Sequence, residues 1–113
     1  MELSKSDKRA ARAIIEKGLQ RELAKGLEEF WNILNNWKEK VSDNSDTYHS
    51  LYKHVRDFDK QIARRYDDMR GSFYLYIIAA QVMEELIEKS DLESLSAEAQ
   101  EAVKQIITIH LGT

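Results

Sequence analysis

The sequence predicts an all-α fold, a four-helix up-and-down bundle with a long first helix, in a single domain that spans residues 1–113. Three observations support this prediction. Apolar residues recur in steps of three and four, which is the period of an α-helix. The chain contains no proline, so nothing forces a break inside a helix. Short clusters of serine, aspartate, asparagine and glycine separate the periodic segments, as turns between helices do.

The first predicted helix runs from Ser6 to Val41. It carries one continuous apolar stripe: Ile15, Leu19, Leu23, Leu27, Phe30, Leu34, Trp37 and Val41. Gly18 and Gly26 interrupt it, each at a cost of about 1 kcal/mol relative to alanine. Such a helix is roughly 54 Å long, whereas a compact domain of this size is only about 35 Å across. Either the helix bends at a glycine or its stripe packs on a second chain.

The second predicted helix follows the polar loop 42–46 and ends before Gly71, a common C-terminal stop. Ser72 is expected to cap a third helix over residues 73–89. The start of this helix is apolar nearly all round, which favours a central, well-covered position.

A turn over residues 90–94 is expected to be anchored by Leu92 and Leu95. A fourth helix then runs from about Ser96 to about His110.

Composition excludes several function classes. Without cysteine there can be no disulfide, thiolate zinc site or cysteine nucleophile. The formal charge of -3, from 17 basic and 20 acidic side chains, gives no general attraction to nucleic acid or anionic membranes. No leader-peptide pattern begins the sequence and no apolar run reaches the ~20 residues of a membrane span. We therefore expect a cytoplasmic protein without membrane segments.

No catalytic motif is recognisable, and an enzyme is not favoured. His54 and Asp57 lie three residues apart on one predicted helix face, with His49 just over a turn earlier. Such a set could bind one metal ion, but exposed polar residues on an amphipathic helix have the same pattern. We expect no catalytic residue, no metal ion and no cofactor, and we keep an enzyme that uses His54 and Asp57 as the third alternative.

The leading hypothesis for function is a helical protein-interaction module, because a stripe that extends beyond its own domain needs a cover. We expect a homodimer, or else another protein partner, held through helix 1. The predicted interaction residues are Leu19, Leu23, Leu27 and Phe30.

The alternative hypothesis is an anion-binding module for a nucleic-acid backbone or a small phosphate ligand. Its predicted residues are Lys60, Arg64, Arg65, Arg70 and Ser72, close to a helix start where backbone N–H groups attract anions. Interleaved aspartates make a salt-bridged, solvated face the simpler interpretation, and nucleic acid is not favoured as a partner.

Aromatic residues on three predicted helices could also line a pocket. Trp37, Tyr52 and Tyr74 are the predicted lining, although aromatic side chains at helical spacing usually belong to a core.

Overall fold

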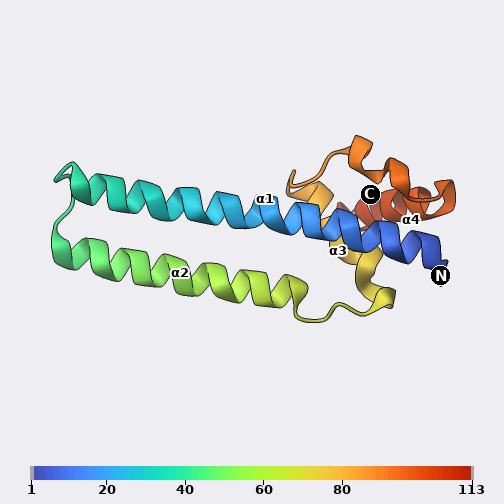
Figure 1. The fold of residues 1–113 in the computed structure, drawn as a ribbon, viewed down its shortest axis with the longest axis horizontal. Helices are drawn as coiled ribbons and strands as arrows, with labels where there is room; N and C mark the ends of the chain where they lie inside the picture. Colours follow the sequence, from blue (N-terminus) through green and yellow to red (C-terminus); the bar gives the residue numbers. More distant parts are fainter. Residues whose placement is uncertain (1, 113) are drawn as a thin grey trace. The chain divides into compact units, whose positions relative to one another are not determined.

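A computed structural model describes residues 2–112 and confirms the all-α prediction (Figure 1). Its elements are α1 (Lys5–Lys38), α2 (Asn44–Tyr66), the 3₁₀ helix η1 (Gly71–Phe73), α3 (Tyr74–Met83), the 3₁₀ helix η2 (Lys89–Ser94) and α4 (Ala97–His110). No strand occurs between residues 2 and 112.

The chain divides into two compact units. Unit 1 combines the N-terminal segment up to Arg21 with the chain from Asp68 onward, and unit 2 is Glu22–Asp67. Helix α1 contributes its first half to unit 1 and its second half to unit 2. The expected single domain over residues 1–113 stays a prediction.

Helix α1 is unbroken through both of its glycines. Its start is capped by Ser4, whose Oγ accepts a hydrogen bond from the backbone N–H of Asp7 at 3.0 Å. A Cβ atom at Gly18 would lie 2.4 Å from Nε2 of Gln81, and one at Gly26 would lie 2.5 Å from Cζ of Phe58. The glycines therefore admit side chains from other elements and do not interrupt the helix.

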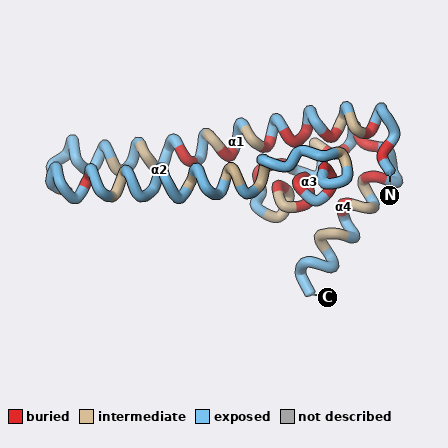
Figure 2. The backbone as a smooth tube through the Cα atoms, turned by 90° about the horizontal axis from the view of Figure 1, so that it is seen from below, coloured by how far each residue is buried: buried red, intermediate tan, exposed pale blue. Residues whose placement is uncertain are grey.

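Unit 1 contains most of the fully buried side chains (Figure 2). Six of the ten residues of α3 are buried, as its apolar sequence predicts: Tyr74, Leu75, Ile77, Ile78, Ala79 and Gln81. They belong to the same core as Ile14 and Ile15 of α1 and Val103 of α4. Leu92 and Leu95 are also buried, which confirms them as the anchors of the turn before α4.

Helix α3 ends at Met83, six residues earlier than predicted. Glu85 has a φ of 61°, and the backbone N–H of Leu86 donates to the carbonyl of Gln81 at 2.9 Å. This left-handed stop lets the consecutive residues Leu86 and Ile87 both enter the core. Helix α1 stops in the same way at Lys40, whose φ is 60°.

Unit 2 is a hairpin of two antiparallel helices, the second half of α1 and all of α2 (Figure 1). Asp43 caps α2 by accepting a hydrogen bond from the backbone N–H of Asp46 at 2.7 Å. The rings of Phe30 and Phe58 meet edge to face with centroids 5.8 Å apart. Figure 2 shows few buried positions here, because only two helices share the unit.

The contact at Gly26 gives the first prediction. Gly26→Ala gains about 1 kcal/mol of helix propensity, but its methyl group collides with the ring of Phe58, and such overpacking costs about 1–3 kcal/mol. We expect a net loss of about 1 kcal/mol in the free energy of unfolding, measured by urea denaturation. In a Phe58→Leu background the same substitution should be neutral or stabilising. If Gly26→Ala alone were more stable than the parent chain, this result would contradict the packing of Phe58 against Gly26.

Candidate functional site: the apolar face of the hairpin

Large apolar side chains remain exposed along both helices of the hairpin. On α1 they are Leu27, Trp31 and Leu34, and on α2 they are Tyr48, Tyr52 and Val55. Each exposes between 40% and 68% of its surface. Both sets follow the same spacing of four and then three residues, so each occupies one side of its helix. We call these six residues the apolar face.

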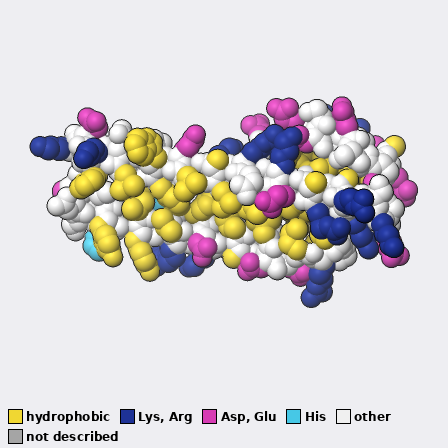
Figure 3. Space-filling model, viewed as in Figure 1, with side chains coloured by type: hydrophobic (Ala, Val, Ile, Leu, Met, Phe, Trp, Pro, Cys, Tyr) yellow, Lys and Arg dark blue, Asp and Glu magenta, His cyan; other side chains and the backbone are white. Residues whose placement is uncertain are grey.

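The two sets lie on the same side of the hairpin. Gly26 and Phe30 mark the side of α1 that faces α2, and Phe58 marks the corresponding side of α2. An α-helix rotates by about 100° per residue, so the apolar set of each helix lies roughly 90° around the helix axis from the side that contacts the other helix. The rotation has the same sense in both helices when each is viewed from its N-terminus. Because the two helices are antiparallel, equal rotations about their axes place both apolar sets on the same side of the hairpin. Figure 3 shows hydrophobic side chains gathered over both helices of the hairpin in a single view.

The apolar face is comparable in area to the largest apolar patch of a typical monomer. At about 200 Å² per aromatic side chain, the exposed parts of Trp31, Tyr48 and Tyr52 alone amount to roughly 400 Å². Leu27, Leu34 and Val55 add to this area. The largest apolar patch of a typical monomer covers about 300–600 Å² and is often functional. The face therefore has the size of an interaction surface.

A buried polar cluster fixes the open end of the hairpin. Glu22, which is 3% exposed, accepts hydrogen bonds from Gln61 Nε2 at 2.9 Å, Arg65 Nη1 at 2.6 Å and Tyr66 Oη at 2.7 Å. All three donors lie in the last turns of α2, so the cluster sets the register of α2 against α1. The net stability gained from such a buried ion pair is small, because desolvation offsets much of its attraction.

The turn end of the hairpin is fixed as well. Trp37 Nε1 donates to Asn44 Oδ1 at 2.6 Å, and the hydroxyls of Ser42 and Thr47 lie 2.9 Å apart. The apolar face between these two ends is thus held on a preorganised frame, which lowers the entropy lost on binding.

The four predicted interaction residues differ in their surroundings. Leu27 is 65% exposed, whereas Leu23 and Phe30 are half-buried and Phe30 packs against Phe58. Leu19 is half-buried and belongs to unit 1.

The predicted interaction surface did not include Trp31 of α1 or the α2 residues Tyr48, Tyr52 and Val55. The signal that could have identified this surface is a shared spacing: apolar residues at positions 48, 52 and 55 repeat the intervals of four and three residues that separate positions 27, 31 and 34.

The predicted anion-binding residues fall in both units. In unit 2, Lys60 and Arg64 are exposed, while Arg65 is occupied by Glu22. In unit 1, Arg70 pairs with Asp68 at 3.2 Å. Arg70 and Ser72 line an open pocket of about 490 Å³.

Lys8 and Glu2 also line this pocket. The side chain of Lys8 approaches the turn closely, since a Cβ atom on Gly71 would lie 3.4 Å from its Cε.

The three residues of the predicted aromatic pocket lie in different settings. Trp37 lines an open hollow of about 1020 Å³ at the turn of the hairpin, and Tyr52 belongs to the apolar face. Tyr74 is buried in unit 1, where its hydroxyl accepts a hydrogen bond from Arg12 Nη1 at 3.5 Å. A pocket shared by all three stays a prediction.

Residues 2–112 contain no group of three or more histidine or acidic side chains placed to hold a metal ion. Nδ1 of His54 lies 2.7 Å from the carbonyl oxygen of Ser50, one turn earlier in α2. Among the described residues, no helix combines the length and the apolar character that crossing a membrane requires.

Comparison with protein families, with curated proteins and with solved structures gives no match to this chain.

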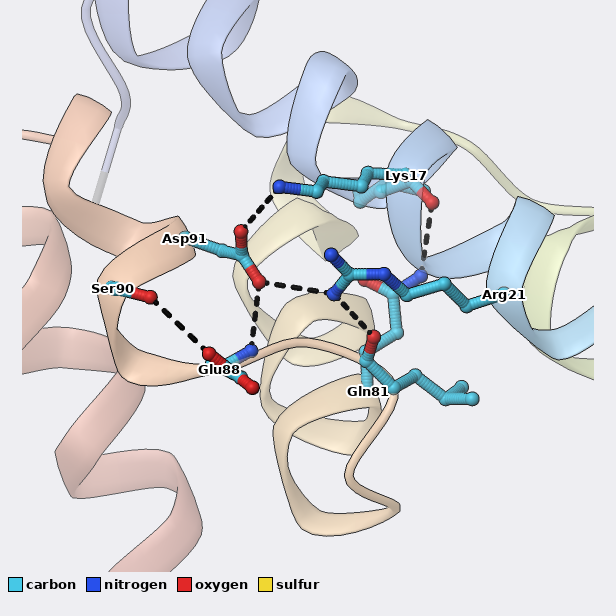
Figure 4. A network of polar contacts seen from close by, with 8 residues as sticks. Lys17, Arg21, Gln81, Glu88, Ser90 and Asp91 are labelled. Carbon is cyan, nitrogen blue, oxygen red and sulfur yellow. Dashed lines mark hydrogen bonds and ion pairs between the residues drawn. The ribbon is translucent and has the colours of Figure 1, made fainter.

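A network of ion pairs and hydrogen bonds in unit 1 surrounds Asp91 (Figure 4). Its carboxylate accepts hydrogen bonds from the backbone N–H of Glu88 at 2.8 Å, from Lys17 Nζ at 2.6 Å and from Arg21 Nη1 at 3.1 Å. The Glu88 N–H and the two cations hold the pKa of Asp91 well below its ordinary value of 3.8. The contacts tie η2 to α1 and have the character of a structural network.

Asp91 gives a prediction about pH. Because its pKa is lower in the folded state than in the unfolded state, its contribution to stability is present above about pH 5 and is lost progressively as the pH falls below that. The melting temperature of Asp91→Asn should therefore lie below that of the parent chain at pH 7, and the gap should narrow between about pH 5 and pH 2. Glu93→Gln, at an exposed carboxylate of the same helix, is the control. A gap that is equal at pH 7 and pH 2 would show that Asp91 acts without its charge.

Proposed function

We propose that this chain is a helical protein-interaction module that self-associates through the apolar face of its hairpin. The observation that carries the proposal is the exposure of six large apolar side chains on one side of a two-helix unit. The frame beneath them is fixed at both ends by polar contacts, at Glu22 and at Trp37. An apolar surface on a frame of this kind is suited to binding a partner.

A second copy of the chain is the partner that fits best. Two faces brought together would remove roughly 800 Å² of aromatic surface from water, to which Leu27, Leu34 and Val55 add. Burial of this surface favours association, against a cost of about 4–15 kcal/mol in lost freedom of motion. Two antiparallel hairpins that meet face to face form a four-helix arrangement, a common way to bury the apolar sides of helices.

Native mass tests the proposal. On a sizing column with light scattering, the parent chain should run as a dimer at low and at high salt, because an apolar interface is not screened by ions. Leu27→Glu and Trp31→Glu should both give monomers that keep their helical content. Ile109→Glu is the matched control, since Ile109 is an equally exposed aliphatic residue in unit 1. A parent chain that is monomeric at every concentration would end the proposal.

A second candidate function is the binding of an anionic ligand at the pocket lined by Lys8, Arg70 and Ser72. The observation in its favour is that Lys8 of α1 and Arg70 line the same pocket, beside Gly71 and Ser72. Glu2 and the pairing of Arg70 with Asp68 reduce the positive charge available there. The exposed bases Lys60 and Arg64 are the candidates for a nucleic-acid backbone.

Separate variants distinguish these anion sites. Binding of a labelled single-stranded oligonucleotide should weaken steeply with salt and fall in Lys60→Ala/Arg64→Ala, whereas binding of inorganic phosphate should fall in Lys8→Ala/Arg70→Ala. Arg65→Ala is unsuitable, because it leaves the buried carboxylate of Glu22 without its cation. Unchanged affinity for both probes in both variants would exclude this function.

A further inference from the structure

We infer that the two hairpins pack with α1 of each copy lying over α2 of the other. This arrangement rests on the proposed self-association and specifies it. A symmetric face-to-face pair of hairpins has two simple solutions. If the two-fold axis runs parallel to the helices, α1 of one copy opposes α2 of the other. If the axis lies across the helices, α1 opposes α1 and α2 opposes α2.

The outer edge of α2, which points away from α1, is basic. Its exposed residues include a repeat of four, three, four and four positions in which each is a cation or a histidine: His49, Lys53, Arg56, Lys60 and Arg64. Asp57 is the one acid beside them between positions 49 and 64. The outer edge of α1 between positions 22 and 35 has no net charge, since its exposed residues are Ala24, Lys25, Glu28, Asn32 and Asn35.

These edges select between the two arrangements. With the axis across the helices, the basic edges of the two α2 helices would run alongside each other, at separations where charges still interact. With the axis parallel to the helices, each basic edge runs along the edge of α1 of the other copy, where the charges of Lys25 and Glu28 cancel. Like charges placed together at an interface are costly and opposite charges are favourable. The charge pattern therefore favours α1 over α2.

The same geometry identifies one cross-copy pair. Gly26 lies level with Phe58 in the hairpin, so Glu28 lies about level with Arg56 on the antiparallel helix. A two-fold axis parallel to the helices keeps that height unchanged. It therefore brings Glu28 of one copy beside Arg56 of the other, at the rim of the apolar face. Within its own chain Arg56 has only a distant contact with Asp57, at 4.0 Å, and its guanidinium lies 5.7 Å from the ring centroid of Tyr52.

Cross-linking tests the arrangement cleanly, because the chain has no native cysteine. Glu28→Cys and Arg56→Cys are made as separate variants, mixed, and treated with a bis-maleimide whose spacer is about one helix–helix distance, 10 Å. Cross-linked dimer should form in the mixture and not in either variant alone. Arg56→Cys that cross-links with itself would overturn the inference in favour of the axis across the helices.

Native mass of the same samples separates the two possible failures. A dimer by mass without cross-linked product in the mixture overturns this arrangement but leaves self-association standing. A monomer by mass overturns both.

Charge exchange gives an independent readout. Arg56→Glu should weaken dimerisation two- to fivefold at low salt, and Glu28→Arg/Arg56→Glu should restore it. Lys104→Glu, at an exposed base in unit 1, should leave dimerisation unchanged. Failure of the double variant to recover would also overturn the pairing.

Discussion

Two helices that lie side by side can cover only one side of each other, and unit 2 consists of only two helices. This constraint explains its surface. The two helices contact each other through Gly26, Phe30 and Phe58. Further apolar side chains lie on an adjacent side of both helices. Those side chains have no third layer to cover them within residues 22–67. The apolar face follows directly from this shortage of layers.

The hairpin is nevertheless well defined, since its contacts are specific. A glycine allows the ring of Phe58 to approach the backbone of α1, so that pair cannot slide without a clash. The Glu22 cluster adds directional hydrogen bonds that one register alone satisfies. In unit 1 the apolar residues of α3 are mostly buried, because α3 lies in a core that also includes residues of α1 and α4.

Periodicity and capping residues predicted much of this fold. Ser96 caps α4 as its sequence indicates, with Oγ accepting from the backbone N–H of Ala99 at 3.2 Å. The early end of α3 was not predicted because the residue in the left-handed conformation that ends it is Glu85, whereas such positions are usually glycine. The sequence pattern indicated a surface cation at Arg65. Its partner Glu22 is more than forty residues away in the sequence, and no local pattern reveals such a pairing.

The candidate site was predicted only in part for a similar reason. The stripe of helix 1 correctly marked an apolar helix, but periodicity does not tell which of its residues another helix of the same chain will cover. Phe30 meets Phe58, while Leu27 stays exposed. That division depends on the pairing of α1 with α2, a tertiary contact that only the structure supplies.

Tryptophan fluorescence tests the central claim most directly, because the two tryptophans of the chain, Trp31 and Trp37, both lie in the hairpin. In the parent chain, which keeps the hydrogen bond from Trp37 to Asn44, Trp31 exposes 66% of its surface in a single copy. A Trp31→Phe variant gives the emission of Trp37 alone. The emission of Trp31, taken as the difference between the two, should move to shorter wavelength as protein concentration rises, and the shift should persist at high salt. Emission that stays at the long wavelength of a water-exposed indole at every concentration would contradict the account.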